Sequence, residues 1–120
     1  MISLEDFKKI EIKVGKILSA EKVPDTDKLL KLSVDLGPSF AKASEGKGGN
    51  DIRTIVSGIS LYFPDCSLLI GKKCMFVANL EPRVIRGIES QGMILAVSAE
   101  DGAFSLLVPD DSIPVGSSAR

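Results

Sequence analysis

Apolar and polar residues alternate with a period of two along several short stretches of the chain, which predicts β-strands. The clearest stretch covers residues 30–36, where leucine and valine occupy every second position. Another begins at Ile10 and keeps its phase as far as Val14, but Ile17 falls on the opposite parity after Gly15. A glycine at such a phase slip predicts a bulge or a sharp bend within the strand.

Further strands are indicated by β-branched and alternating segments in the second half of the chain. They are predicted over residues 52–57, 73–79, 91–97 and 104–108. The last two are joined through Asp101 and Gly102, a dipeptide typical of tight hairpin turns. We therefore expect a terminal hairpin after the fifth strand.

The segments between these strands have different characters. Ser3 is placed to cap a short helix over residues 4–9, with Phe7 as its apolar anchor. Residues 24–27 read as a turn, and residues 58–71 as an irregular crossover with at most a short helix. Residues 37–51 are rich in glycine, serine, alanine and lysine, which predicts a long flexible loop insertion between two strands.

Five or six short strands, one short helix and no strand–helix alternation indicate an all-β chain. A length of 120 residues is typical of one domain, and we expect a single domain over residues 1–120. A five-stranded OB-fold barrel, with a short N-terminal helix and a C-terminal hairpin extension, accounts most economically for this pattern. An SH3-like barrel or a small sandwich would show the same periodicity.

The composition excludes several classes of function. The chain has fifteen basic and sixteen acidic residues, so it does not bind nucleic acid by bulk positive charge. The chain has no histidine, which excludes imidazole catalysis. Without a nucleophile–base pair or a phosphate-cradling glycine loop, we expect no enzyme, no cofactor and no metal.

The two cysteines and the apolar runs indicate a cytoplasmic protein. Cys66 and Cys74 are eight residues apart and match no metal-ligand pair, so we expect two reduced thiols, although a disulfide is not excluded. The longest apolar runs have five residues, far fewer than a membrane span needs. The first residues lack the pattern of a secretory leader.

Charge is divided unevenly along the chain. Residues 53–94 carry five basic and three acidic residues, whereas residues 95–119 carry four acidic residues and no basic one. A barrel with this polarity would have one basic face and one acidic end. Overall neutrality therefore does not exclude a local site for a polyanion.

The segment at residues 79–90 is the most distinctive part of the chain. Arg83 and Arg86 stand three residues apart, and the planar guanidinium suits phosphates and guanine edges. Asn79 and Ser90 add donors and acceptors for a base edge or a ribose hydroxyl. In an OB-fold barrel this connection borders the nucleic-acid face. Alternatively, it is a solvated loop whose arginines pair with its own glutamates.

Aromatic residues are scarce, with one tyrosine, five phenylalanines and no tryptophan. Proteins that stack the bases of an extended single strand need an aromatic platform. The composition therefore favours recognition of the shape and backbone of a folded RNA.

Several segments, taken together and in order, resemble a known family. They are VGKI at residues 14–17, PDTDKLLKLSVDLG at 24–37, RTIVSGI at 53–59, YFP at 62–64, GKKCMFVANLEPRVIRGIESQGMILA at 71–96, and the final DG…LLVP. They resemble the tRNA-binding domain found at the C-terminus of many methionyl-tRNA synthetases. The same domain occurs as free-standing bacterial tRNA-binding proteins and in synthetase-associated cytokine-precursor factors.

This resemblance implies a non-catalytic OB-fold domain that binds tRNA, often as a homodimer, alone or with an aminoacyl-tRNA synthetase of the methionyl type. Carried over by position, its nucleic-acid-binding residues would be Asn79, Arg83, Arg86, Ser90, Met93, Lys28, Arg53 and Ser57. Arg83 stands where the family often has lysine. Other roles are open for some of them: a core position for Met93, a pair with Asp51 for Arg53, a backbone contact for Ser57 and plain solvation for Lys28.

Two features depart from the family pattern. The 37–51 connection is longer than usual, as an inert insertion or as a segment beside the binding face. The chain contains no aminoacylation domain, so it is a free-standing protein, a synthetase subunit or an excised domain. A protein-binding, chaperone-like relative of the same fold is the alternative function, although the intact 79–90 pattern counts against it. Residues 61–64 and 113–115 are candidate dimer contacts, or pack within one monomer.

Overall fold

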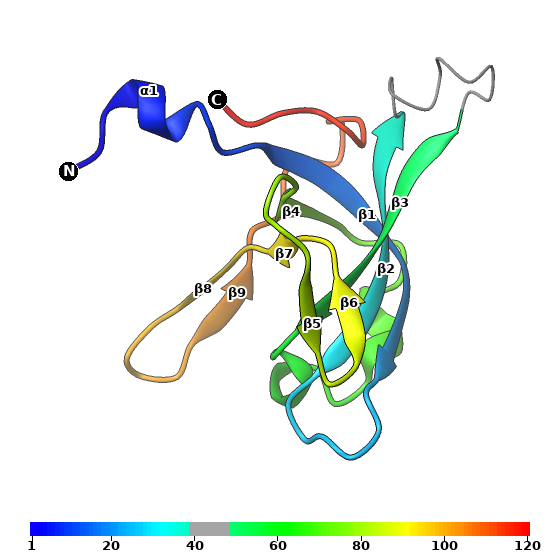
Figure 1. The fold of residues 1–120 in the computed structure, drawn as a ribbon. Coiled ribbons are helices and arrows are strands. Elements are labelled where there is room, and N and C mark those ends of the chain that lie inside the picture. Colours follow the sequence, from blue (N-terminus) through cyan, green and yellow to red (C-terminus); the bar gives the residue numbers. More distant parts are fainter. Residues whose placement is uncertain (39–48) are drawn as a thin grey trace.

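The computed structural model describes residues 1–38 and 49–120 as a strongly curled β-sheet with a short N-terminal helix (Figure 1). Five antiparallel strands form the sheet in the order β3-β2-β1-β4-β7. They are β1 (Ile12–Lys22), β2 (Leu30–Pro38), β3 (Asn50–Ser57), β4 (Lys73–Val77) and β7 (Met93–Ile94). The all-β, OB-like barrel expected from the sequence is confirmed.

The long strand β1 is shared by both halves of the sheet. Residues 12–16 pair with β4 and residues 16–22 pair with β2. The expected irregularity is present but lies between Ile17 and Ser19, while Gly15 stays in register opposite Cys74. Gly15 has a different role, because a Cβ there would lie 2.7 Å from the Phe76 ring. The glycine lets β1 approach the core closely.

The barrel is closed by hydrogen bonds between β3 and the chain just before β7. The Gln91 backbone donates to the Thr54 carbonyl at 2.8 Å, and the Thr54 amide donates to Gln91 Oε1 at 3.1 Å. Two residues further along β3, the Val56 amide donates to Ser90 Oγ at 3.0 Å. Two side chains therefore take the place of backbone acceptors at this seam.

The core lies inside the curl, and β2 shows the predicted alternation in full, with Leu30, Leu32, Val34 and Leu36 buried. The largest fully buried side chains from the other elements are Phe76, Ile17, Ile55, Leu69 and Cys74. Both cysteines are free thiols. Burial raises the pKa of the Cys74 thiol to about 11, with Lys72 acting weakly in the opposite direction.

Several predicted boundaries need correction. The helix α1 is shorter than expected, Leu4–Phe7, with the Ser3 side chain accepting from the Asp6 amide. The fourth strand ends at Val77, and β2 and β3 extend into both ends of the predicted 37–51 loop. Residues 39–48 of that loop lie outside the described residues.

The predicted fifth strand, residues 91–97, is split at Leu95 into β7 and β8 (Ala96–Ser98). It divides because the Leu95 amide donates to the Met75 carbonyl while the Leu95 carbonyl accepts from Leu107, so the chain passes from β4 to a new partner there. Strand β8 then pairs with β9 (Phe104–Leu106) as the predicted terminal hairpin.

The crossover before β4 contains two short 3₁₀ helices, η1 (Ser60–Tyr62) and η2 (Cys66–Leu69). The Tyr62 ring stacks on Phe104 with centroids 3.9 Å apart, and Phe63 meets the same ring edge-on. Two of the residues proposed as a dimer contact therefore pack within the monomer. Leu61 is exposed.

The C-terminal tail lies along the first residues of β1. The Gly116 amide donates to the Val14 carbonyl, the Val14 amide to Ser117, and the Ala119 amide to Ile12. The tail thus covers the edge that β2 leaves free. No helix in the described part of the chain has the length and apolar character needed to cross a membrane.

Candidate nucleic-acid interface

The segment singled out between the fourth and fifth strands is a β-hairpin, not the loop expected from the sequence. Strand β5 (Arg83–Ile85) pairs with β6 (Ile88–Ser90) as a separate two-stranded sheet. Its two turn residues, Arg86 and Gly87, have φ values of 52° and 79°. Positive φ at both positions is what a type I′ turn requires, and it matches the twist of the strands.

The hairpin tip meets the 23–29 loop that joins β1 to β2 (Figure 1). Residues 25–29 and Arg86 line one hollow, so Lys28 and Arg86 reach it from two different segments of the chain. Asp25 and Asp27 line it too. The hollow therefore offers two cations and two carboxylates within one polar depression.

A second depression runs along the inner face of the hairpin. Because Arg83 pairs with Ser90 and Ile85 with Ile88, these side chains share one face, whereas Val84 and Glu89 share the outer face. The inner groove is lined by Arg83, Ile85, Leu80 and Met93, among other residues. Met93 is 46% exposed, so it is not the core residue that its apolar character allowed.

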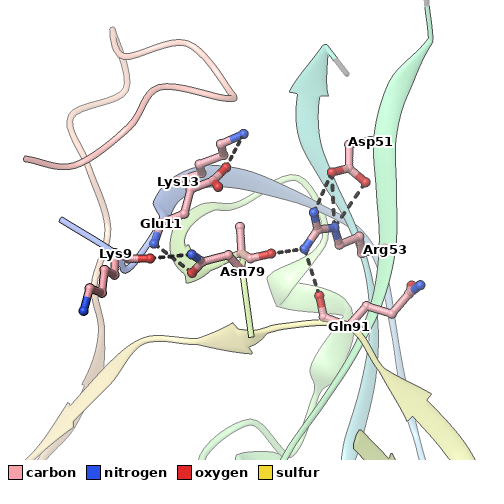
Figure 2. Close-up of polar contacts among 8 residues, drawn as sticks. Lys9, Glu11, Lys13, Asp51, Arg53, Asn79 and Gln91 are labelled. Atoms are coloured by element: carbon pink, nitrogen blue, oxygen red, sulfur yellow. Dashed lines mark hydrogen bonds and ion pairs between the residues drawn. The ribbon is translucent and has the colours of Figure 1, made fainter. Parts of the chain in front are cut away.

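Arg53 closes the base of the hairpin from β3 (Figure 2). Its Nε donates to both carboxylate oxygens of Asp51 at 3.2 Å, and Nη2 donates to Asp51 Oδ2 at 2.9 Å. Its Nη1 donates to the carbonyls of Ala78 and Gln91, on either side of the hairpin. The pair with Asp51, one of the two roles open for Arg53, is therefore present.

Asn79 uses both ends of its side-chain amide on the N-terminal segment (Figure 2). Oδ1 accepts from the Glu11 amide at 2.8 Å, and Nδ2 donates to the Lys9 carbonyl at 2.6 Å. The neighbouring Ala78 amide donates to the Glu11 carbonyl. Asn79 thus clamps the chain that leads out of α1.

Ser90 is 4% exposed, with Oγ accepting from Val56 and donating to the Gly92 carbonyl. Ser57 lies at the end of β3, opposite Leu30. The other seven predicted site residues form two groups. Lys28, Arg83, Arg86 and Met93 are exposed around the hairpin, while Asn79, Ser90 and Arg53 are bonded to the backbone that supports it.

The ion pairs of the described residues leave the hairpin arginines to solvent. Those pairs are Lys9–Asp6, Lys13–Glu11, Lys31–Glu21 and Arg53–Asp51. Within residues 1–38 and 49–120, neither Arg83 nor Arg86 pairs with Glu81 or Glu89. The acidic residues Glu100 and Asp101 lie at the tip of the β8–β9 hairpin, which points away from β5–β6 (Figure 1).

The sequence analysis named the Asp51 pair of Arg53 as an alternative, and Asp51 and Arg53, two apart in a strand, do share a face. It missed one contributor, Gln91. Nothing in the sequence pointed to Gln91, because its Oε1 accepts from the amide of Thr54, which is 37 residues away in the chain.

Residues 12–118 match a protein-family model described as "Putative tRNA binding domain". The chain belongs to this tRNA-binding domain family. Among its curated relatives, a methionine–tRNA ligase of Porphyromonas gingivalis is 42% identical over 119 residues. One from Methanococcus aeolicus is 44% identical over 117 residues. The chain covers 16% and 15% of these two enzymes, so it spans only a small part of their length.

Two solved structures show the same architecture over their whole length. The methionyl-tRNA-synthetase-related protein from Pyrococcus horikoshii has a TM-score of 0.84 at 38% identity, covering 100% of this chain and 98% of that one. The CsaA chaperone protein from Picrophilus torridus has a TM-score of 0.78 at 28% identity, covering 100% of both chains. The tRNA-binding family resemblance expected from the sequence motifs is confirmed.

Proposed function

We propose that this tRNA-binding domain is a non-catalytic module that holds folded tRNA between the 23–29 loop and the β5–β6 hairpin. The observation that carries the proposal is the hollow where these segments meet, with Lys28 and Arg86 on its walls. Two cations on separate loops suit the phosphates of a backbone that passes between them. The nearby carboxylates and Thr26 add acceptors for ribose hydroxyls and base amino groups.

The inner groove of the hairpin extends this surface. Leu80 and Met93 are both about half exposed, and Arg83 lies beside them. An unstacked base would pack on the two apolar side chains while its phosphate pairs with the guanidinium. The contact residues we propose are therefore Lys28, Arg83, Arg86 and Met93. Asn79, Ser90 and Arg53 would instead hold the backbone that supports them.

We further propose that the domain works as a homodimer beside an aminoacyl-tRNA synthetase, in the cytoplasm where tRNA is charged. Support for a dimer comes from α1, which has no buried residue and projects from the barrel (Figure 1). Leu4 in the helix is exposed, and so are Ile2 before it and Ile10 after it. A helix of four residues is not stable alone in water, so a partner surface would account for it. A second tRNA site in the dimer raises avidity.

A chaperone-like role is the second candidate, favoured by the likeness to the CsaA chaperone protein from Picrophilus torridus. The exposed Val84 on the outer face of the hairpin would then contact polypeptide instead of RNA. The two functions separate in one experiment: tRNA either competes with an unfolded, reduced protein for the same chain or leaves that binding unchanged.

The deciding measurement is a gel-shift titration with bulk tRNA and with duplex DNA at two salt concentrations. The proposal predicts preference for tRNA and weaker binding at the higher salt. Lys28→Gln should weaken tRNA binding several-fold, whereas Lys16→Gln, an exposed change on β1, should have little effect. Equal and weak binding to both nucleic acids would refute the proposal.

A further inference from the structure

We propose that Arg53, held by Asp51, is a positioning residue that sets the direction of the β5–β6 hairpin and does not itself contact RNA. The inference rests on the proposed tRNA function, because the hairpin carries two of the proposed contacts. It gives a partly buried ion pair outside those contacts a defined part in binding.

The donors of Arg53 are almost fully used within the protein. A guanidinium has five N–H groups. Nε and Nη2 face the Asp51 carboxylate, and Nη1 reaches both the Ala78 and Gln91 carbonyls. The side chains of Arg53 and Asp51 are each 24% exposed. A phosphate would have to break these bonds and approach a carboxylate.

The two carbonyls are the important partners, because they flank the hairpin in the chain. Ala78 comes directly after β4, and Gln91 comes directly after β6. One rigid planar group therefore joins the incoming and outgoing strands and ties both to β3. Within the described residues, β5 and β6 form ladder pairs only with each other, and an isolated two-stranded hairpin is marginally stable in water.

The length of the hairpin makes the position of its tip sensitive to the orientation of its two ends at Ala78 and Gln91. Five residues separate Gln91 from Arg86, which is a lever of roughly 16 Å at about 3.3 Å per strand residue. A tilt of about 10° at the base would move Arg86 by roughly 3 Å. Charge-assisted hydrogen bonds need donor and acceptor within about 2.9 Å, so this movement would break a phosphate contact.

Asp51→Asn separates positioning from direct contact by the sign of its effect. If Arg53 bound phosphate, removal of a neighbouring carboxylate would strengthen tRNA binding. If Arg53 positions the hairpin, loss of its anchor should weaken binding, by about tenfold. Glu89→Gln is the matched control, because it removes the same charge from the outer face of the hairpin without touching the base, and it should bind tRNA slightly more tightly.

Arg53→Lys tests the shape of the group at constant charge. A single ammonium cannot reach the carboxylate and both carbonyls together, so this variant should bind as weakly as Asp51→Asn. Retained affinity would show that the charge alone matters and would overturn the proposal. If Arg53→Lys does not fold, Asp51→Asn carries the test, because it replaces one oxygen by an NH₂ group.

The salt dependence adds a readout that a simple loss of stability would not give. The slope of log affinity against log salt counts phosphate contacts. It should fall by slightly less than one unit in Arg86→Gln and by a similar amount in Asp51→Asn, because the displaced Arg86 no longer pairs with a phosphate, whereas it should keep the wild-type value in Glu89→Gln. Amide exchange at residues 83–90 should accelerate in Asp51→Asn, while core amides such as Leu32 keep their protection.

The outcomes distinguish the inference from the function on which it rests. Wild-type protein that does not bind tRNA refutes the proposed function. If wild type binds, then folded Asp51→Asn that binds equally or more tightly, or that keeps the full wild-type salt slope, refutes the positioning role. Unchanged amide exchange in the hairpin would also refute it.

Discussion

The turn residue Arg86 sits in a backbone conformation that favours another amino acid. Its φ of 52° lies in the left-handed region, which costs a residue other than glycine or asparagine about 1–2 kcal/mol. Asn-Gly is the preferred pair for such a two-residue turn. We predict that Arg86→Asn stabilises the hairpin, by up to about 1 kcal/mol, and simultaneously weakens tRNA binding.

The loss of binding follows from the contacts around the hollow. A hydrogen bond to a charged group contributes about 1.5–3 kcal/mol, which corresponds to roughly a 10- to 150-fold change in affinity. Asparagine also leaves Asp25 and Asp27 in the hollow without the cation that Arg86 supplies to its lining. The expected result is therefore a fold-change near the upper part of this range at low salt.

The assay pairs two measurements on the same variant. Fluorescence anisotropy with labelled tRNA gives the affinity, and amide exchange at residues 85–88 gives the local stability of the turn. Arg86→Lys is the control, because it keeps the positive φ and the charge, so it should match the wild type in turn stability and retain most of the binding. Arg86→Asn with faster exchange in the turn, or with unchanged affinity, would refute the reasoning.

Three further predictions test the scaffold. Gly15→Ala should lower the free energy of unfolding by about 1–3 kcal/mol in urea melts, because the new methyl group would lie 2.7 Å from the Phe76 ring. Asn79→Ala should free the N-terminal segment and increase proteolysis before β1, with tRNA affinity unchanged, and a loss of affinity would make Asn79 a contact instead. Raising the pH from 9 to 11 should remove about 2 kcal/mol of stability relative to Cys74→Ala, because the unfolded thiol ionises first and the folded thiol only near its raised pKa.

The sequence predicted those parts of the fold that are decided by the alternation of apolar and polar side chains along a strand. Strand β2 is the clearest case, since its even-numbered apolar residues are all buried. The hairpin at 83–90 was missed because each of its strands has three residues and its turn carries Arg-Gly instead of Asn-Gly. Local propensity is too weak over such lengths, and the hairpin depends on long-range bonds from Arg53 and Ser90.

The candidate site divides along the same line. The exposed cations Arg83 and Arg86 could be proposed as contacts from the sequence, because charge beside a proline and a glycine is visible there. The hydrogen bonds of Asn79 and Ser90 could not be predicted, because their partners, Lys9 and Val56, are distant in the chain. Polar residues that match a binding motif by position can thus act by holding the binding element and not by touching the ligand.

The near-neutral charge of the chain acquires a specific meaning from this division. Of fifteen basic residues, the surface around the hairpin holds three proposed phosphate contacts, Lys28, Arg83 and Arg86. At about 0.7–0.9 unit of salt slope per contact, one chain should show a slope between about −2 and −3. A fourfold rise in salt would then weaken binding by roughly 20- to 40-fold. Such a small number of contacts gives modest affinity to one chain, so a second copy would contribute by avidity. For the same reason, rigid placement of each contact through Arg53 and Asp51 matters more than the number of charges.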